Sequence, residues 1–308
     1  MPTADSLRAR RIRDEAIGGA LIAAASAQFG AVVVMGKVVL RRGLPVPSAL
    51  AFRFGIGAVL LTALLVLLRR PVAAAPGERR GLAALAVLGY GVESGCFFAA
   101  LSHGTAAAAT LLFFVYPVLV AVVSWALGAG PPSRLASVSL ALSVAGAGVV
   151  VGTGGKLSIQ AVGVLFALAS AATYSAYLVG ADRVLRRTNP FTSAMWTSAG
   201  ASLGLGCFAL VTGQAAWPTA AEWPALLGMG AATAGAFVCT LAGLRLLGAV
   251  RTAIVAATEP LAAALLAWVF LGEAVTAGTA VGGALIVAAA VAASIARARP
   301  PVPAAPGP

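Results

Sequence analysis

Apolar residues fill this chain in runs of about twenty, and short polar or basic breaks separate the runs. A helix needs about twenty such residues to cross the hydrocarbon core of a bilayer, whereas a membrane β-barrel would show alternating segments of about ten. The pattern therefore predicts an all-α polytopic membrane protein. We expect ten transmembrane helices, at residues 16–38, 48–68, 81–101, 104–128, 134–152, 160–182, 191–213, 223–246, 250–271 and 275–296.

The composition supports a lipid environment. Hydrophobic residues make up 60% of the chain, charged residues only 10%, and the mean hydropathy is +0.98. A soluble domain carries about 25% charged residues. The three cysteines lie inside apolar runs without a metal-binding spacing, and His103 is the single histidine. We therefore expect no metal site and no cofactor.

The net charge of +12 is distributed unevenly between the two sides of the predicted bundle. With Arg53 left out, sixteen Lys and Arg residues fall on the side of the termini and four fall on the other side. By the positive-inside rule, both termini are predicted to be cytoplasmic, with the chain in a bacterial inner membrane. The basic charge is then an orientation signal, so we expect no nucleic-acid partner.

The second half of the chain repeats the first. "GALIAAASA" (19–27) aligns with "GVLFALASA" (163–171) at an offset of 144, and Cys96, Pro117 and Trp125 align with Cys239, Pro260 and Trp268 at 143. Since each copy has five spans, the second must enter the membrane from the opposite side, as in many secondary transporters. The expected organisation is an N-terminal segment 1–15, repeats 16–152 and 160–296, a periplasmic linker 153–159 and a disordered tail 297–308.

Two features point to a known family. The chain has the ten-span, two-repeat pattern over residues 16–296, and it carries "TEP" (258–260) followed by "LLAWVFLGE" (265–273). It resembles the EamA type of the drug/metabolite transporter superfamily, and within it the YddG-type amino-acid exporters. The first repeat departs from the pattern, because Tyr116 stands where the second repeat has Glu259. The resemblance implies export of amino acids, aromatic and other apolar ones included.

Polar and aromatic side chains recur on particular faces of the predicted helices. On span 3 they are spaced i, i+3, i+4 and i+7, which is one helical face, and polar groups inside a membrane usually face the protein interior. Spans 1, 3, 4, 6, 8 and 9 are predicted to surround a cavity, while span 2, rich in Leu and Val, is expected to face lipid. The candidate lining residues are Gln28, Tyr90, Glu93, Ser94, Phe97, Phe113, Tyr116, Tyr174, Tyr177, Thr233, Phe237, Thr240 and Glu259, with Trp196 as a further aromatic.

Several of these residues have a specific expected role. Glu93 and Glu259 lie near mid-depth, where a carboxyl can exchange a proton or bind a substrate ammonium; the alternative is a neutral carboxyl bonded to a neighbouring helix. Pro117 and Pro260 are predicted to kink their helices and act as hinges. Lys37, Arg41, Arg42 and Arg53 are expected near the outer mouth, in contact with solvent or lipid headgroups; the alternative is that one of them meets a substrate carboxylate.

Some functions are disfavoured by what the sequence contains. "GTGGKLS" (152–158) does not fit a P-loop, and no metalloprotease or nucleophile-elbow motif occurs, so we expect no catalytic residues and no ATP-driven transport. The prediction is a secondary or facilitative transporter for amino acids. Another metabolite or a drug-like solute, a channel, and an intramembrane enzyme remain as alternatives. The expected partners are the solute and membrane lipid. GxxxG spacings at Gly148–Gly152 and Gly278–Gly282 suit either packing within the chain or a weak homodimer.

Overall fold

The computed structural model describes residues 4–129, 159–256, 259–272 and 277–295, together with scattered positions between 134 and 149. All regular structure in these residues is helical. Seven helices there are long and apolar enough to cross a membrane, and they match predicted spans 1–4 and 6–8. Span 5, most of the linker and the C-terminal tail lie outside the described residues. Spans 9 and 10 correspond to two shorter described helices, Glu259–Leu271 and Ala277–Ile295.

The helices follow the order of the predicted spans. In the first repeat they are α1 (Ala4–Arg41), α2 (Val46–Leu67), a third span built from α3 (Arg79–Ala84), the π-helix η1 (Leu85–Gly91) and α4 (Val92–Ser102), and a fourth built from α5 (Ala106–Phe113), α6 (Tyr116–Ser124) and η2 (Trp125–Ala129). In the second repeat they are α8 (Ala161–Val184), α9 (Pro190–Val211), α10 (Trp223–Val255), α11 (Glu259–Leu271) and α12 (Ala277–Ile295).

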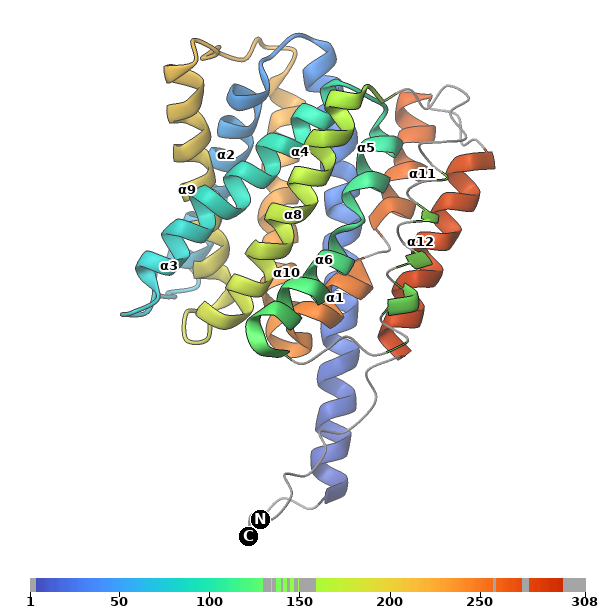
Figure 1. The fold of residues 1–308 in the computed structure, drawn as a ribbon. Helices are drawn as coiled ribbons and strands as arrows, with labels where there is room; N and C mark the ends of the chain where they lie inside the picture. The colour runs from blue at the N-terminus through green and yellow to red at the C-terminus, as the bar shows by residue number, and fades with distance from the viewer. Residues whose placement is uncertain are drawn as a thin grey trace.

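Helix α1 begins well before the predicted membrane span and projects beyond the rest of the bundle (Figure 1). Its first turns contain mostly Ala, Leu, Arg and Glu, which favour a helix even without an apolar face to bury. An ion pair of 2.7 Å between Glu15 Oε1 and Arg251 Nη1 joins this part of α1 to α10. The N-terminal segment therefore continues the first helix.

The fourth span is interrupted next to the proline of its Tyr-Pro pair. Helix α5 ends at Phe113 and α6 begins at Tyr116. Proline has no N–H to donate to the preceding turn, so the break follows from the residue itself. The hydroxyl of Ser175 on α8 lies 3.0 Å from the main-chain carbonyl of Tyr116 and 2.6 Å from that of Ala171 on its own helix, so it shares its hydrogen between the break and the second repeat.

The packing of the helices is symmetric about the two repeats. Helix α1 packs along α10, α4 along α8, and α2 along α9. The counterparts of α1 and α10 in the other repeat are α8 and the third span, which ends in α4, so the α1–α10 contact corresponds to the α4–α8 contact. Helices α2 and α9 are counterparts of each other, so their contact corresponds to itself. Helices α1 and α8 also run in opposite directions (Figure 1). This is the relation that a two-fold axis in the membrane plane produces between inverted repeats.

One end of the bundle, which we call the arginine-rich end, carries the loops at 68–78 and 185–189. Glu78 joins these loops across the repeats. Its carboxylate accepts hydrogen bonds from the backbone N–H groups of Arg186 (3.0 Å), Arg187 (2.7 Å) and Thr188 (2.9 Å) and from the Thr188 hydroxyl (2.6 Å). Burial by itself raises the pKa of Glu78, but these four hydrogen bonds outweigh burial and the net shift of the pKa is downward.

Candidate functional site

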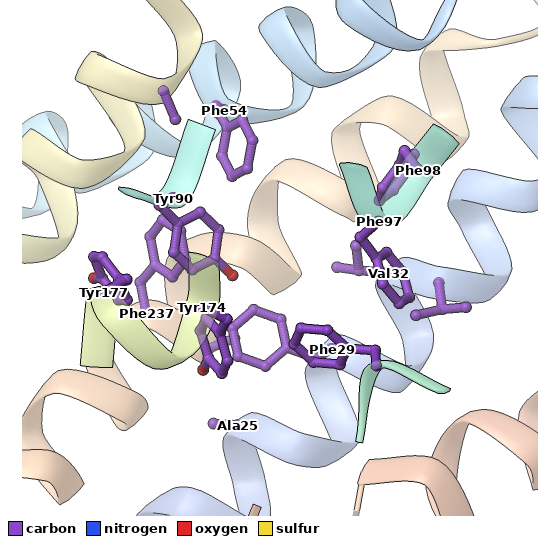
Figure 2. Close-up of a cluster of buried hydrophobic side chains, with 14 of the residues drawn as sticks. Ala25, Phe29, Val32, Phe54, Tyr90, Phe97, Phe98, Tyr174, Tyr177 and Phe237 are labelled. Carbon is purple, nitrogen blue, oxygen red and sulfur yellow. The ribbon is translucent and has the colours of Figure 1, made fainter. Parts of the chain in front are cut away.

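A small cavity lies where the two repeats meet. It encloses about 380 Å³ of empty space, but only about 30 Å³ admits the centres of water molecules, which is room for a few waters. Figure 2 shows the aromatic side chains around it, which come from α1, α2, η1, α4, α8 and α10. The lining residues are Phe29, Val32, Val33, Arg53, Tyr90, Glu93, Ser94, Phe97, Phe98, Phe113, Tyr174 and Glu259.

Arg53 lines this cavity, and the expectation that it meets solvent or headgroups is wrong. Its residue is only 3% exposed, because α2 packs along α9 and α10 instead of facing lipid along its whole length. The Arg53 Nε donates to the hydroxyl of Thr233 on α10 at 2.7 Å. The guanidinium lies 4.5 Å from the ring centroid of Phe54 and 5.4 Å from that of Phe98. Two cation–π contacts and one hydrogen bond therefore hold a buried positive charge at the cavity wall.

Glu93 on α4 lines the same cavity. One carboxylate oxygen accepts a hydrogen bond from the Ser94 hydroxyl at 3.0 Å, and the other accepts one from the Ser170 hydroxyl on α8 at 3.2 Å. The residue is 5% exposed. Hydroxyls from two helices thus orient the carboxyl, as expected for a buried polar group.

Glu259 brings a second carboxyl to the same cavity from the other repeat. It stands in the first turn of α11. A helix N-terminus carries a partial positive charge, which favours an acidic side chain there. Arg53 interacts electrostatically with both Glu93 and Glu259. The cavity therefore contains one guanidinium and two carboxyl groups within an otherwise apolar and aromatic wall.

Aromatic rings form a continuous layer around the charged groups. The ring of Tyr90 lies edge-on to Phe237 with a centroid distance of 4.5 Å, and it contacts Tyr174 at 6.1 Å (Figure 2). Phe113 contacts Phe97 at 5.4 Å and Tyr174 at 5.3 Å. Edge-to-face contacts of this kind stabilise the packing beyond the area they bury.

The structure brings together seven of the candidate residues as direct lining: Tyr90, Glu93, Ser94, Phe97, Phe113, Tyr174 and Glu259. Tyr116, Tyr177, Thr233 and Phe237 are buried behind this lining and contact it. Gln28 and Thr240 lie outside it, and the Gln28 amide donates to the carbonyl of Ala24 one turn earlier.

The aromatic wall does not include Trp196. Its indole N–H donates to the carbonyl of Val72 at 3.0 Å, so the ring belongs to the contact between α9 and loop 68–78 at the arginine-rich end.

Sequence reasoning placed Arg53 at the outer mouth, with a substrate carboxylate only as the alternative partner, and it missed the contribution of α2. A signal was present, because a lone charged residue within an apolar span is costly and therefore marks a functional position. Arg53 lies near the start of span 2, which favoured a place for it at the membrane interface. In the part of the chain that the structure describes, no group of three or more His, Cys, Asp or Glu residues could hold a metal ion.

Comparisons with known proteins agree with this architecture. The profile of the EamA-like transporter family matches residues 16–152 and again residues 161–295. An uncharacterised transporter of Synechocystis sp. is 31% identical over 178 residues, which cover 54% of this chain and 52% of that protein. An uncharacterised transporter of Archaeoglobus fulgidus is 27% identical over 210 residues, covering 68% of this chain and 74% of the other. The chain thus spans about half the length of the first relative and three quarters of the second.

A solved crystal structure, described only as that of a protein, superposes with a TM-score of 0.66 at 24% identity. It covers 88% of this chain and 96% of the other chain. At this identity, the likeness concerns the fold. The match extends over both repeats, so the two-repeat arrangement is shared by the whole solved chain.

Proposed function

We propose, since the chain belongs to the EamA-like transporter family, that it exports amino acids across a bacterial inner membrane by alternating access of its two repeats. One observation carries the choice of substrate. A guanidinium and two carboxyl groups line a cavity at the repeat interface whose remaining wall is aromatic and aliphatic. A zwitterion with an apolar side chain has complementary chemistry at each of its three parts.

Arg53 is the proposed anchor for the substrate carboxylate. Guanidinium has five N–H donors in a planar fork that matches a carboxylate. The structure uses its Nε for Thr233, and the rings of Phe54 and Phe98 hold the group in place. Arg53 lines the cavity, so its guanidinium is proposed to bind the carboxylate of a solute there. It already interacts with Tyr90, Glu93 and Glu259, and a bound carboxylate adds a further partner for the buried charge.

Glu93 and Glu259 are the proposed sites for the substrate ammonium or for a coupling proton. They come from different repeats, and each is on a helix that packs against the opposite repeat. A change in the protonation or occupancy of either carboxyl therefore acts on the contact between repeats. Pro117 and Pro260 are the proposed hinges, because a proline removes one backbone hydrogen bond from a helix.

The substrate proposal is tested with purified protein in liposomes. Counterflow of a radiolabelled amino-acid panel should be saturable, and apolar or aromatic amino acids should compete best. Arg53→Gln should lower the rate at least tenfold for zwitterions. Saturable flux of a different solute, with no competition by any amino acid, supports the alternative of another metabolite or drug-like substrate. Flux without saturation or counterflow indicates a channel, and chemical alteration of the solute indicates an enzyme.

Proton coupling is tested separately with Glu93→Gln and Glu259→Gln. If a carboxyl carries the coupling proton, the variant should transport at a rate that no longer changes with pH, while it still performs counterflow with solute on both sides. Wild-type pH dependence in both variants would exclude these two groups as proton carriers. Sidedness is tested by labelling of single cysteines in intact cells, where the arginine-rich end should be protected from an impermeant reagent.

A further inference from the structure

A second hollow lies apart from the central cavity, at the arginine-rich end of the bundle. About 350 Å³ of it is open to water, roughly ten times the water-accessible space in the central cavity. That is within the range of ligand pockets for small molecules. All its lining residues belong to α8, α9, α10 and the loop after α8. They are Ala181, Asp182, Leu185, Arg186, Ser193, Leu241, Leu244 and Arg245. We call this hollow the vestibule.

Two features suit the vestibule to an anionic group. Arg186 and Arg245, both exposed to solvent, bring two positive charges to one wall. Ser193 is the second feature: it is 1% exposed and lines the hollow, and its hydroxyl has no hydrogen-bond partner among the residues that the structure describes. A buried hydroxyl without a partner is costly, so a ligand or water that bonds to it is favoured.

The positions of the first repeat that correspond to the vestibule carry other side chains. The offset of 143, which applies from Pro47 and Pro190 onward, places Leu50 at the position of Ser193, Phe98 at that of Leu241 and Ser102 at that of Arg245. Leu50 and Phe98 are 0% and 1% exposed. The hydroxyl of Ser193 and the cation of Arg245 therefore do not follow from the repeat, because the first repeat has a leucine and a serine in their places.

We propose that the vestibule is a binding site for the carboxylate of a small zwitterionic solute, which binds there before it reaches the central cavity. The carboxylate contacts Arg186 and Arg245 at the mouth and accepts a hydrogen bond from Ser193 at the base. Asp182 on the rim adds a negative charge that suits an ammonium group and disfavours a solute with two negative charges. Thr197, fully buried one helical turn beyond Ser193 on α9, is the next hydroxyl inward.

The inference rests on the proposed transport of amino acids, but the site itself is tested without transport. In a protein with Cys96, Cys207 and Cys239 replaced by alanine, Ser193→Cys puts a thiol at the base of the vestibule with little change in volume. Detergent-purified protein is reacted with the anionic sulfonatoethyl methanethiosulfonate and, separately, with its cationic trimethylammonium analogue. Labelling is followed by mass spectrometry, and thermal unfolding verifies that the variant is folded.

The rate of each reagent is first divided by its rate with a free thiol in solution. After this correction the anionic reagent should react about five- to tenfold faster at low salt, because two nearby cations raise the local concentration of anions. Arg186→Gln or Arg245→Gln should remove most of this preference. Arg187→Gln is the matched control: it removes the same charge from the same loop but does not line the vestibule. Equal rates for the two reagents, no effect of Arg186→Gln and Arg245→Gln, or a thiol that reacts only after unfolding would each overturn the proposal.

Protection experiments separate this site from the substrate proposal. L-phenylalanine should slow labelling at position 193, while phenethylamine, which lacks the carboxylate, should not. Equal protection by both would overturn the carboxylate site. A third outcome is that neither compound protects, while the anionic reagent still reacts faster and Arg245→Gln still removes that preference. This result would support an anion site in the vestibule and would count against amino acids as the substrates.

Discussion

Replacing Glu78 by glutamine should destabilise the protein more than any other conservative change at a loop. Four hydrogen bonds reach the two carboxylate oxygens from residues 186–188 of the other repeat. A hydrogen bond to a charged group contributes about 1.5–3 kcal/mol. Glutamine keeps one acceptor oxygen, but its NH₂ faces N–H or O–H donors, so at least two bonds are lost. Allowing for loop relaxation, we expect a loss of about 3 kcal/mol.

The effect should depend on pH in a defined direction. The pKa of Glu78 is lowered in the folded protein, and in the unfolded chain it is about 4.3. A group with a lowered folded pKa stabilises the protein fully above its unfolded pKa, and this contribution disappears as the pH falls through the folded pKa. Since Glu78→Gln does not titrate, the gap between wild type and variant should be constant near neutral pH and shrink below about pH 4.

Thermal unfolding of detergent-purified protein, followed by tryptophan fluorescence, measures this gap. At about 2 °C per kcal/mol for a chain of this size, the Tm should fall by about 6 °C at pH 7. Glu222→Gln is the control, because Glu222 likewise directly precedes the helix of the third span in its repeat, but its carboxylate accepts hydrogen bonds from Thr219 of its own turn, at 2.7 and 3.1 Å. Two results would contradict this reasoning: equal Tm shifts for Glu78→Gln and Glu222→Gln, or a Tm difference between wild type and Glu78→Gln that does not narrow in acid. Either would show that the hydrogen bonds of Glu78 between the repeats do not stabilise the arginine-rich end.

Three further outcomes follow from the described contacts. Arg53→Lys keeps the positive charge but loses the planar guanidinium and its hydrogen bond to Thr233. The KM for amino-acid counterflow should therefore rise about tenfold, which is equivalent to about 1.4 kcal/mol of binding free energy, while kcat changes less. Gly230→Ala should lower the unfolding free energy by about 1–3 kcal/mol in thermal scans, since the new Cβ would lie 2.5 Å from Ile56 Cγ2 on α2. Ser175→Ala removes the 3.0 Å bond to the Tyr116 carbonyl and should cost about 1–2 kcal/mol in the same scans; an unchanged Tm would show that the helix break does not depend on it.

The chain's family and two-repeat plan follow from the sequence because both depend on local requirements. A bilayer demands about twenty apolar residues per span, so hydropathy locates the helices whatever their packing. An odd number of spans per repeat inverts the second copy without any reference to contacts. The bend beside Pro117 was equally predictable, because proline lacks the donor that a continuous helix needs. The polar face of span 3 was readable from its spacing for the same reason.

Only the tertiary structure decided where Arg53 lies and which helices close the cavity. Periodicity assigns a side chain to a face of its own helix, but it does not say which neighbour covers that face. The packing of α2 along α9 and α10 turned Arg53 inward, and Phe98 completed its surroundings. The hydrogen bonds of Glu78 join residues 108 to 110 positions apart in the sequence. The hollow around Ser193 joins residues up to 64 positions apart, from Ala181 to Arg245. Such contacts depend on how the helices share one volume, and no single segment of the sequence carries that information.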